Sequence, residues 1–142
     1  VNAPVFAQER GLTVDELKSS DHEDFATLIT VTYQTTSSRR ILSGTLFGKG
    51  DPRIVRLDEY DFDALPKGHM LFYINEDVPG IIGRVGTIMG ACNVNIAQMS
   101  CGRHEVGGRA LTILNVDSRI SEDVLEELLA DTDITWVKRI SL

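Results

Sequence analysis

The pattern of hydrophobic and polar positions divides this chain into two halves. The second half predicts four strands and two helices in the order βαββαβ, with strand-like runs separated by stretches that are apolar at helical spacing. This order is typical of a ferredoxin-like domain, in which four antiparallel strands carry both helices on one face. In chain order the predicted elements cover residues 69–74, 80–91, 94–101, 110–116, 121–129 and 134–140.

The strand predicted over residues 94–101 contains an irregularity. Its apolar alternation slips by one position at Ile96 and Ala97. The slip predicts a β-bulge, and we expect the bulge to turn Asn95 towards the turn that carries Asp77.

The first predicted helix of this half carries a row of glycines. Gly83, Gly86 and Gly90 recur at spacings of three and four residues and therefore share one helix face. Glycine inside a helix costs roughly 0.5–1 kcal/mol relative to alanine, so we expect a close neighbour on this face. That neighbour is either a second subunit or the other helix of the same domain.

The first half has mainly β signals. A short helix is predicted after Asn2, followed by a hairpin and further extended chain, while residues 13–18 are ambiguous. So small a unit buries only about 60% of its unfolded surface, which indicates part of a larger domain. We predict an α+β chain with a partial domain over residues 1–66 and a ferredoxin-like domain over residues 67–142. The predicted elements of the first half are 3–10, 28–36, 40–47, 53–57 and 60–65.

Charge and composition exclude several classes of partner. The chain has 142 residues and a formal net charge of −7, which argues against binding to nucleic acid or to an anionic membrane. It has no apolar run long enough to span a bilayer and no secretory signal. Cys92 and Cys101 are too few for a zinc or iron–sulfur site. We expect a soluble chain in the reducing cytoplasm, with no metal.

No catalytic constellation is visible. The glycines from Gly80 to Gly86 lie inside a helical pattern and lack the spacing of a dinucleotide fingerprint. The three histidines are scattered, with no nucleophile elbow beside them. We predict no catalytic residue in this chain.

The turn over residues 75–80 is the strongest candidate for a binding site. A helix start offers unpaired N–H groups to a carboxylate, and Asp77 just before it suits an ammonium group. This combination matches a free amino acid. The alternative is that Asp77 serves only as the N-cap, with Pro79 and Gly80 in the first turn of the helix.

Several motifs together resemble the C-terminal regulatory region of D-3-phosphoglycerate dehydrogenases. The resemblance covers essentially the whole chain. The second half resembles an ACT domain, and the first half resembles the later part of the allosteric substrate-binding domain that precedes it in the long form of that enzyme. The motifs are Val1-Asn2-Ala3-Pro4, Glu9-Arg10-Gly11, Ser43-Gly44-Thr45-Leu46-Phe47-Gly48, Asp77-Val78-Pro79-Gly80 and Asn93-Val94-Asn95-Ile96.

The resemblance implies a regulatory fragment without a cofactor of its own. The parent enzyme would oxidise 3-phosphoglycerate with NAD in other domains, at the entry to serine synthesis. L-Serine, the feedback effector, would bind between two ACT domains. By position Asp77 would take its ammonium group, Asn75 and Asn95 its polar groups, and backbone N–H groups near Pro79 and Gly80 its carboxylate.

The resemblance also implies assembly and a second candidate site. Two ACT domains would pair through sheet edges and the glycine-bearing helix, and the intact enzyme would form a dimer or a tetramer. Some relatives bind a phosphorylated substrate through basic side chains of the preceding domain. Arg53 occupies one such position, whereas Tyr60, Leu65 and Asn115 occupy the others and are not cationic.

Two other functions fit the same domain types. One is a regulatory part of an iron–sulfur L-serine dehydratase, which would need cluster-binding cysteines elsewhere. The other is an ACT-type dimerisation module that binds no small molecule. Binding of an amino acid would separate the serine sensor from this second alternative.

Overall fold

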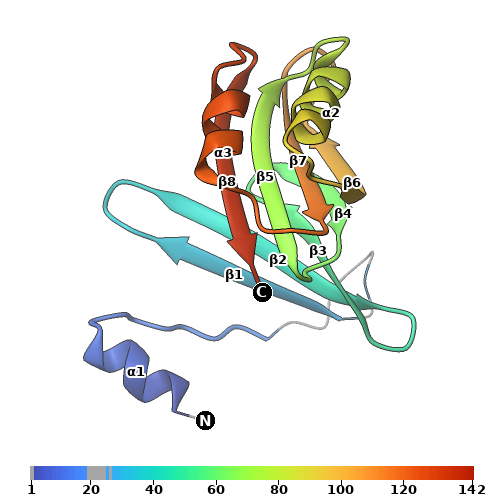
Figure 1. Cartoon of the computed structure of the whole chain (residues 1–142). Coiled ribbons are helices and arrows are strands. Elements are labelled where there is room, and N and C mark those ends of the chain that lie inside the picture. Colours follow the sequence, from blue (N-terminus) through green and yellow to red (C-terminus); the bar gives the residue numbers. More distant parts are fainter. Residues whose placement is uncertain (1, 19–24, 26) are drawn as a thin grey trace.

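The structure, a computed structural model, describes residues 2–18, 25 and 27–142 (Figure 1). Its strands form two separate four-stranded antiparallel sheets, here called sheet A and sheet B. The helices are α1 (Ala3–Glu9), α2 (Ile81–Ala91) and α3 (Glu122–Leu129). Sheet A contains β1 (Leu28–Gln34), β2 (Arg39–Phe47), β3 (Asp51–Leu57) and β4 (Tyr60–Ala64). Sheet B contains β5 (His69–Glu76), β6 (Ile96–Arg103), β7 (Arg109–Val116) and β8 (Ile134–Ser141).

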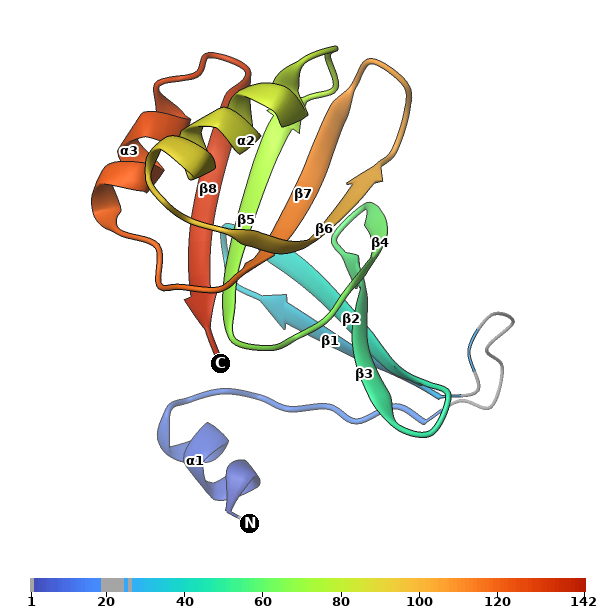
Figure 2. The ribbon, with the colours of Figure 1, turned by 45° about the vertical axis from the view of Figure 1, so that its right-hand side comes forward.

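Sheet B has the ferredoxin-like arrangement that the sequence predicts. Its strand order is β6-β7-β5-β8, and α2 and α3 cover one face of it (Figures 1 and 2). Tyr73 and Leu114 from the strands pack on that face with Val85 of α2 and Leu128 of α3. We call this side the helix face and the other the helix-free face. The α+β fold with a ferredoxin-like βαββαβ half is therefore confirmed.

The predicted β-bulge is present at the start of β6. The pairing of β6 with β7 shifts register between Ile96 and Gln98, which confirms the reading of the slipped alternation. Beyond the bulge, Cys101 pairs with Thr112 and Gly102 pairs with Leu111. Because paired residues point to the same side, Cys101 lies on the helix face and Gly102 on the helix-free face.

The row of glycines on α2 does not pack against the other helix. A Cβ built on Gly83, Gly86 or Gly90 meets no atom of the described residues within 4 Å. Tight packing within the domain, one of the two readings of these glycines, is therefore wrong. The physical reason is that Ile81, Val85 and the rest of the buried stripe face the sheet, which leaves the glycine side exposed.

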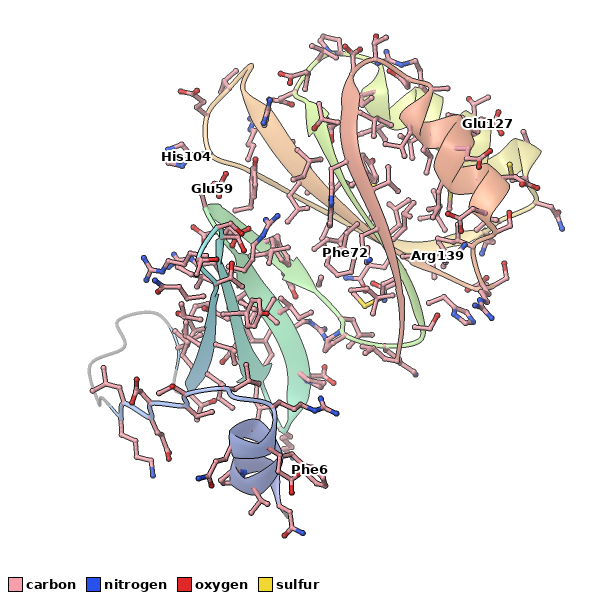
Figure 3. All side chains as sticks on the ribbon, turned by 90° about the vertical axis from the view of Figure 1, so that its left-hand side faces the viewer. Phe6, Glu59, Phe72, His104, Glu127 and Arg139 are labelled. Atoms are coloured by element: carbon pink, nitrogen blue, oxygen red, sulfur yellow. The ribbon has the colours of Figure 1, made fainter. Side chains whose placement is uncertain are left out.

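Sheet A has the strand order β1-β2-β3-β4 and packs on sheet B mainly through its last strand, β4. Tyr60 and Ala64 of β4 form a second core with Phe72, Leu111 and Ile113 on the helix-free face of sheet B. Figure 3 shows Phe72 between the two sheets. The backbone of β4 also runs close to β6, since a Cβ on Gly102 would overlap the carbonyl group of Asp61.

The rest of sheet A leaves apolar surface open. Large apolar side chains on β1 and β2 remain exposed, and a groove of about 730 Å³ lies among them. The short helix α1 buries none of its residues and lies apart from both sheets (Figure 1). Residues 13–18, which the sequence left ambiguous, form neither helix nor strand. The exposed side chains are Ile29, Val31, Tyr33, Leu42 and Leu46.

Within the described ranges, no helix is long and apolar enough to cross a membrane.

Candidate functional site

The turn between β5 and α2 holds the candidate binding residues in a defined backbone conformation. The Asp77 N–H donates to the Gly108 carbonyl at 2.8 Å, which fixes the turn to the β6–β7 loop. Gly80 has φ +92°, a left-handed conformation that favours glycine, and it is the N-cap of α2. The reading of Asp77 as N-cap is therefore wrong, because Gly80 takes that position and makes no side-chain cap.

The absence of a side-chain cap leaves donors at the start of α2. The Ile81 N–H reaches the Val78 carbonyl at 3.4 Å, and the Arg84 N–H donates to the Gly80 carbonyl at 3.0 Å. The N–H groups of Ile82 and Gly83 find no backbone acceptor among the described residues. These two donors, with the helix dipole behind them, suit a carboxylate.

The Asp77 carboxylate is held by the β6–β7 hairpin. Its Oδ2 atom accepts hydrogen bonds from Arg103 Nη1 at 2.9 Å and from the Gly107 N–H at 3.3 Å. The Arg103 hydrogen bond, then the Gly107 N–H, hold the pKa of Asp77 below its usual range. Asp77 is therefore an anion at neutral pH. Its Oδ1 atom has no partner among the residues that the structure describes.

Asn75 lies directly beneath this turn and is almost completely buried, with 2% of its surface exposed. Its Nδ2 atom donates to the Glu76 carbonyl at 2.7 Å. Thr112 Oγ1 lies 3.4 Å from Asn75 Oδ1 and 3.5 Å from Cys101 Sγ. The side chain of Asn75 thus belongs to a polar cluster on the helix face of the sheet.

The Tyr73 hydroxyl lies on the same face and is buried without a hydrogen-bond partner in the described part of the chain. Its burial raises the pKa of Tyr73.

Asn95 lies far from Asp77 within one chain. β5 and β6 run parallel on either side of β7, so the start of β6 lies beside the start of β5. Asp77 instead follows the end of β5. Asn95 Nδ2 donates to Asp117 Oδ2 at 2.6 Å, at its own end of the sheet. The expectation that the bulge turns Asn95 towards Asp77 is therefore wrong.

Arg53, the candidate anion-binding residue, is paired within sheet A. Its Nε lies 2.9 Å from Asp63 Oδ1, and its Nη2 lies 3.8 Å from Asp51 Oδ2. The guanidinium also stands 5.8 Å from the centre of the Phe47 ring. The two carboxylates therefore neutralise the positive charge of Arg53 that would otherwise attract a phosphate.

The other positions that resemble an anion site have structural roles. Tyr60 is buried in the core between the sheets. Asn115 Nδ2 donates to the carbonyls of Leu65 and Lys67 at 2.9 and 3.0 Å, which ties down the segment that joins the two sheets.

Sequence reasoning missed Arg103. The signal was the alternation after the bulge, which places Met99, Cys101 and Arg103 on the same face of β6. Arg103 ends this row beside the glycine-containing β6–β7 turn, and its guanidinium contacts Asp77 in the turn before α2. In the part of the chain that the structure describes, no group of three or more His, Cys, Asp or Glu side chains is placed to hold a metal ion.

Comparison with known proteins assigns both halves. The family described as the D-3-phosphoglycerate dehydrogenase intervening domain matches residues 1–58, and the ACT domain family matches residues 69–132. The boundary after residue 66 remains a prediction; sheet A ends at Ala64 and sheet B begins at His69.

Similar curated proteins have the same name in distant organisms. The chain is 41% identical over 130 residues to D-3-phosphoglycerate dehydrogenase of Archaeoglobus fulgidus. This match covers 90% of this chain and 24% of that protein. It is 35% identical over 142 residues to the Bacillus subtilis D-3-phosphoglycerate dehydrogenase. This match covers 100% of this chain and 27% of that protein. The chain thus spans about a quarter of the length of these relatives. It belongs to the D-3-phosphoglycerate dehydrogenase family as a C-terminal regulatory region, with a first half that matches the intervening domain and a second half that matches the ACT domain.

Proposed function

We propose that this chain senses L-serine as the feedback effector of a D-3-phosphoglycerate dehydrogenase. The observation that carries the proposal is the turn before α2, where an ionised carboxylate at Asp77 precedes the N–H groups of Ile82 and Gly83, which have no backbone acceptor among the described residues. A small zwitterion would place its ammonium group on Asp77 and its carboxylate at the helix start near Pro79 and Gly80. Asn75, beneath the turn, would contact the polar groups of the effector through its second Nδ2 proton.

The proposed site needs a second copy of the chain. β6 is an edge strand of sheet B, and two identical edge strands related by a twofold axis pair in antiparallel fashion. Such pairing brings the start of β6 in one copy to the end of β6 in the other. Asn95 of the second copy would then approach Asp77 and complete the effector site. The glycine side of α2, which is exposed in this chain, would lie near the same interface.

The effector would act by shifting a population of conformations. Serine held between two ACT domains would stabilise one relative orientation of the copies, and the domains attached to them would follow. The parent enzyme would use NAD to oxidise 3-phosphoglycerate in catalytic domains outside this chain, in the cytoplasm, as a dimer or a tetramer. The chain itself would carry regulation and no catalysis.

Calorimetric titration tests this function directly. The chain is titrated with L-serine, glycine and L-alanine, and L-serine is repeated on Asp77→Ala and Asn95→Ala. Asp61→Ala serves as the matched control, because Asp61 is also an aspartate paired with an arginine, Arg56, but lies on β4. We expect saturable serine binding in the wild type and the control, and none in the two site variants.

The opposite result has a definite meaning. A folded wild-type dimer that binds none of the three amino acids would contradict the proposal. It would identify the ACT half as an assembly module.

A further inference from the structure

We propose that Arg103 binds the α-carboxylate of the effector together with the N–H groups at the start of α2, so that the Asp77–Arg103 pair recognises both charges of the amino acid. This inference rests on the function proposed above and deepens it. Neither the turn motif nor the resemblance to the family assigns a role to Arg103. Its position relative to Asp77 and α2 suggests this role.

Arg103 lies on the correct face of the sheet. It pairs with Ala110 at the end of β6 and shares the helix face with Cys101 and Thr112. The Asp77 turn and the start of α2 lie at the same end of the sheet, since Glu76 pairs with Arg109 beside it. A ligand at the turn would therefore meet the guanidinium from the side of the helices.

Both partners of the pair retain free hydrogen-bonding atoms. Asp77 uses only Oδ2 to accept from Arg103 and Gly107, which leaves Oδ1 for an ammonium group. Arg103 donates through Nη1 alone, and its Nε and Nη2 have no partner among residues 2–18, 25 and 27–142. A guanidinium fork of this kind matches the geometry of a carboxylate. A zwitterion beside the pair would form an alternating arrangement of four charges.

The neighbouring arginines already form ion pairs with other carboxylates. Arg84 on α2 is offset by two carboxylates, those of Asp131 and Asp133. Arg109 pairs with Glu76 on the helix-free face. Arg103 has one carboxylate partner in the described part of the chain, and 54% of its side chain is exposed, so it can take a second anion.

The experiment compares L-serine with L-serinamide, which keeps the ammonium and hydroxyl groups but lacks the carboxylate. Both are titrated into the wild-type chain and the Arg103→Gln variant, at a pH where both ammonium groups are protonated. We expect the wild type to prefer serine by roughly 10- to 100-fold, as the loss of a charge-assisted hydrogen bond implies. In Arg103→Gln we expect this preference to fall by at least about threefold, because glutamine cannot form the charged pair, and the remainder reflects the N–H groups at the start of α2.

Two further variants make the result specific. Arg109→Gln removes the same charge at the same end of the sheet but from the opposite face, and should keep the wild-type preference. Arg103→Lys keeps the charge without the fork and should restore part of the preference. It also provides a folded variant if Arg103→Gln is unstable.

The outcomes separate the two proposals. If the wild type binds serine and Arg103→Gln keeps its full preference over serinamide, the assignment of Arg103 is wrong and the serine site stands. Equal losses in Arg103→Gln and Arg109→Gln would also overturn it, since they would indicate general electrostatics. If the wild type binds neither compound, the proposed function fails and the role of Arg103 fails with it.

Discussion

Asp77 and Asn95 lie at opposite ends of sheet B within one chain. Asp77 follows the end of β5, beside Arg109, whereas Asn95 precedes Ile96, which pairs with Val116 beside the start of β5. A strand of this length spans on the order of 25 Å. The two residues can therefore contact one small ligand only when two copies of the chain meet.

The ion pair between Asp77 and Arg103 predicts an acid-dependent contribution to stability. The pKa of Asp77 is lowered in the folded chain, so the pair stabilises the fold above the ordinary aspartate range and is lost as the pH falls through the lowered value. The unfolding free energy of the wild type should exceed that of Asp77→Asn at neutral pH. This difference should shrink towards zero in acid. Denaturant unfolding of both chains across this pH range measures it.

A second variant identifies the cause. The Arg103 hydrogen bond is the largest contribution to the lowered pKa. In an Arg103→Gln background, Asp77→Asn should therefore show a much smaller pH-dependent difference. If the pH-dependent difference in unfolding free energy were as large in this background as in the wild type, a group other than Arg103 would be the cause of the lowered pKa of Asp77.

Gly102→Ala should loosen the contact between the two sheets. A methyl group at this position would overlap the carbonyl of Asp61, and β4 would have to move away from β6. Overpacking of this kind costs about 1–3 kcal/mol of unfolding free energy. Thermal and denaturant unfolding measure the loss.

Gly83→Ala is the matched control for this substitution. A Cβ at Gly83 meets no atom within 4 Å in the part of the chain that the structure describes, and the residue lies inside helix α2. At chain concentrations low enough to keep the chain monomeric, the same change should raise the unfolding free energy by roughly 0.5–1 kcal/mol, because alanine favours the helix. If Gly102→Ala were as harmless as Gly83→Ala, the close approach of β4 to β6 would be wrong.

Tyr73→Phe should leave the chain as stable as before, or more stable. The Tyr73 hydroxyl is fully buried and has no hydrogen-bond partner in the described residues. An unsatisfied buried hydroxyl costs about 1–3 kcal/mol, and phenylalanine removes it without a change of shape. Denaturant unfolding should show an equal or higher midpoint. A loss above about 1 kcal/mol would indicate that the hydroxyl has a partner.

Arg53→Gln should lower the unfolding free energy without any effect on phosphate binding. The Arg53 side chain is 19% exposed, pairs with Asp63 and stands over Phe47, so its loss should cost about 1–2 kcal/mol of unfolding free energy. Inorganic phosphate should bind neither the wild type nor the variant measurably in calorimetric titration. Phosphate binding that disappears in Arg53→Gln would establish the anion site instead.

The local features of the ACT half could be predicted from the sequence because their signals are local. The slipped alternation at Ile96 predicts the bulge, and the apolar spacing after Gly80 predicts α2. The placement of Asn95 could not be obtained in the same way. Helix α2 returns the chain along the sheet, so β6 starts at the end of the sheet where β5 starts, and a local bend cannot offset that distance.

The ion pairs of Arg103 and Arg53 could not be predicted because each joins segments that are distant in the sequence. Arg103 and Asp77 are 26 residues apart, and the hairpin turn at Gly107 brings them together. The pairing of Arg53 with Asp63 likewise depends on the register of β3 and β4. Neither pair has the short, regular spacing of a helix or a strand by which contacts can be predicted from the sequence.

Subunit complementation tests the two-copy serine site most directly. Asp77→Ala and Asn95→Ala chains are mixed, and L-serine binding is measured by calorimetry while native mass spectrometry follows the exchange of subunits. Each mixed dimer would combine an intact Asp77 from one copy with an intact Asn95 from the other, so about a quarter of all sites in an equal mixture should bind serine. Each variant alone should bind none. Mixed dimers that form but bind no serine would contradict a site shared between copies, and so would full binding by either variant alone.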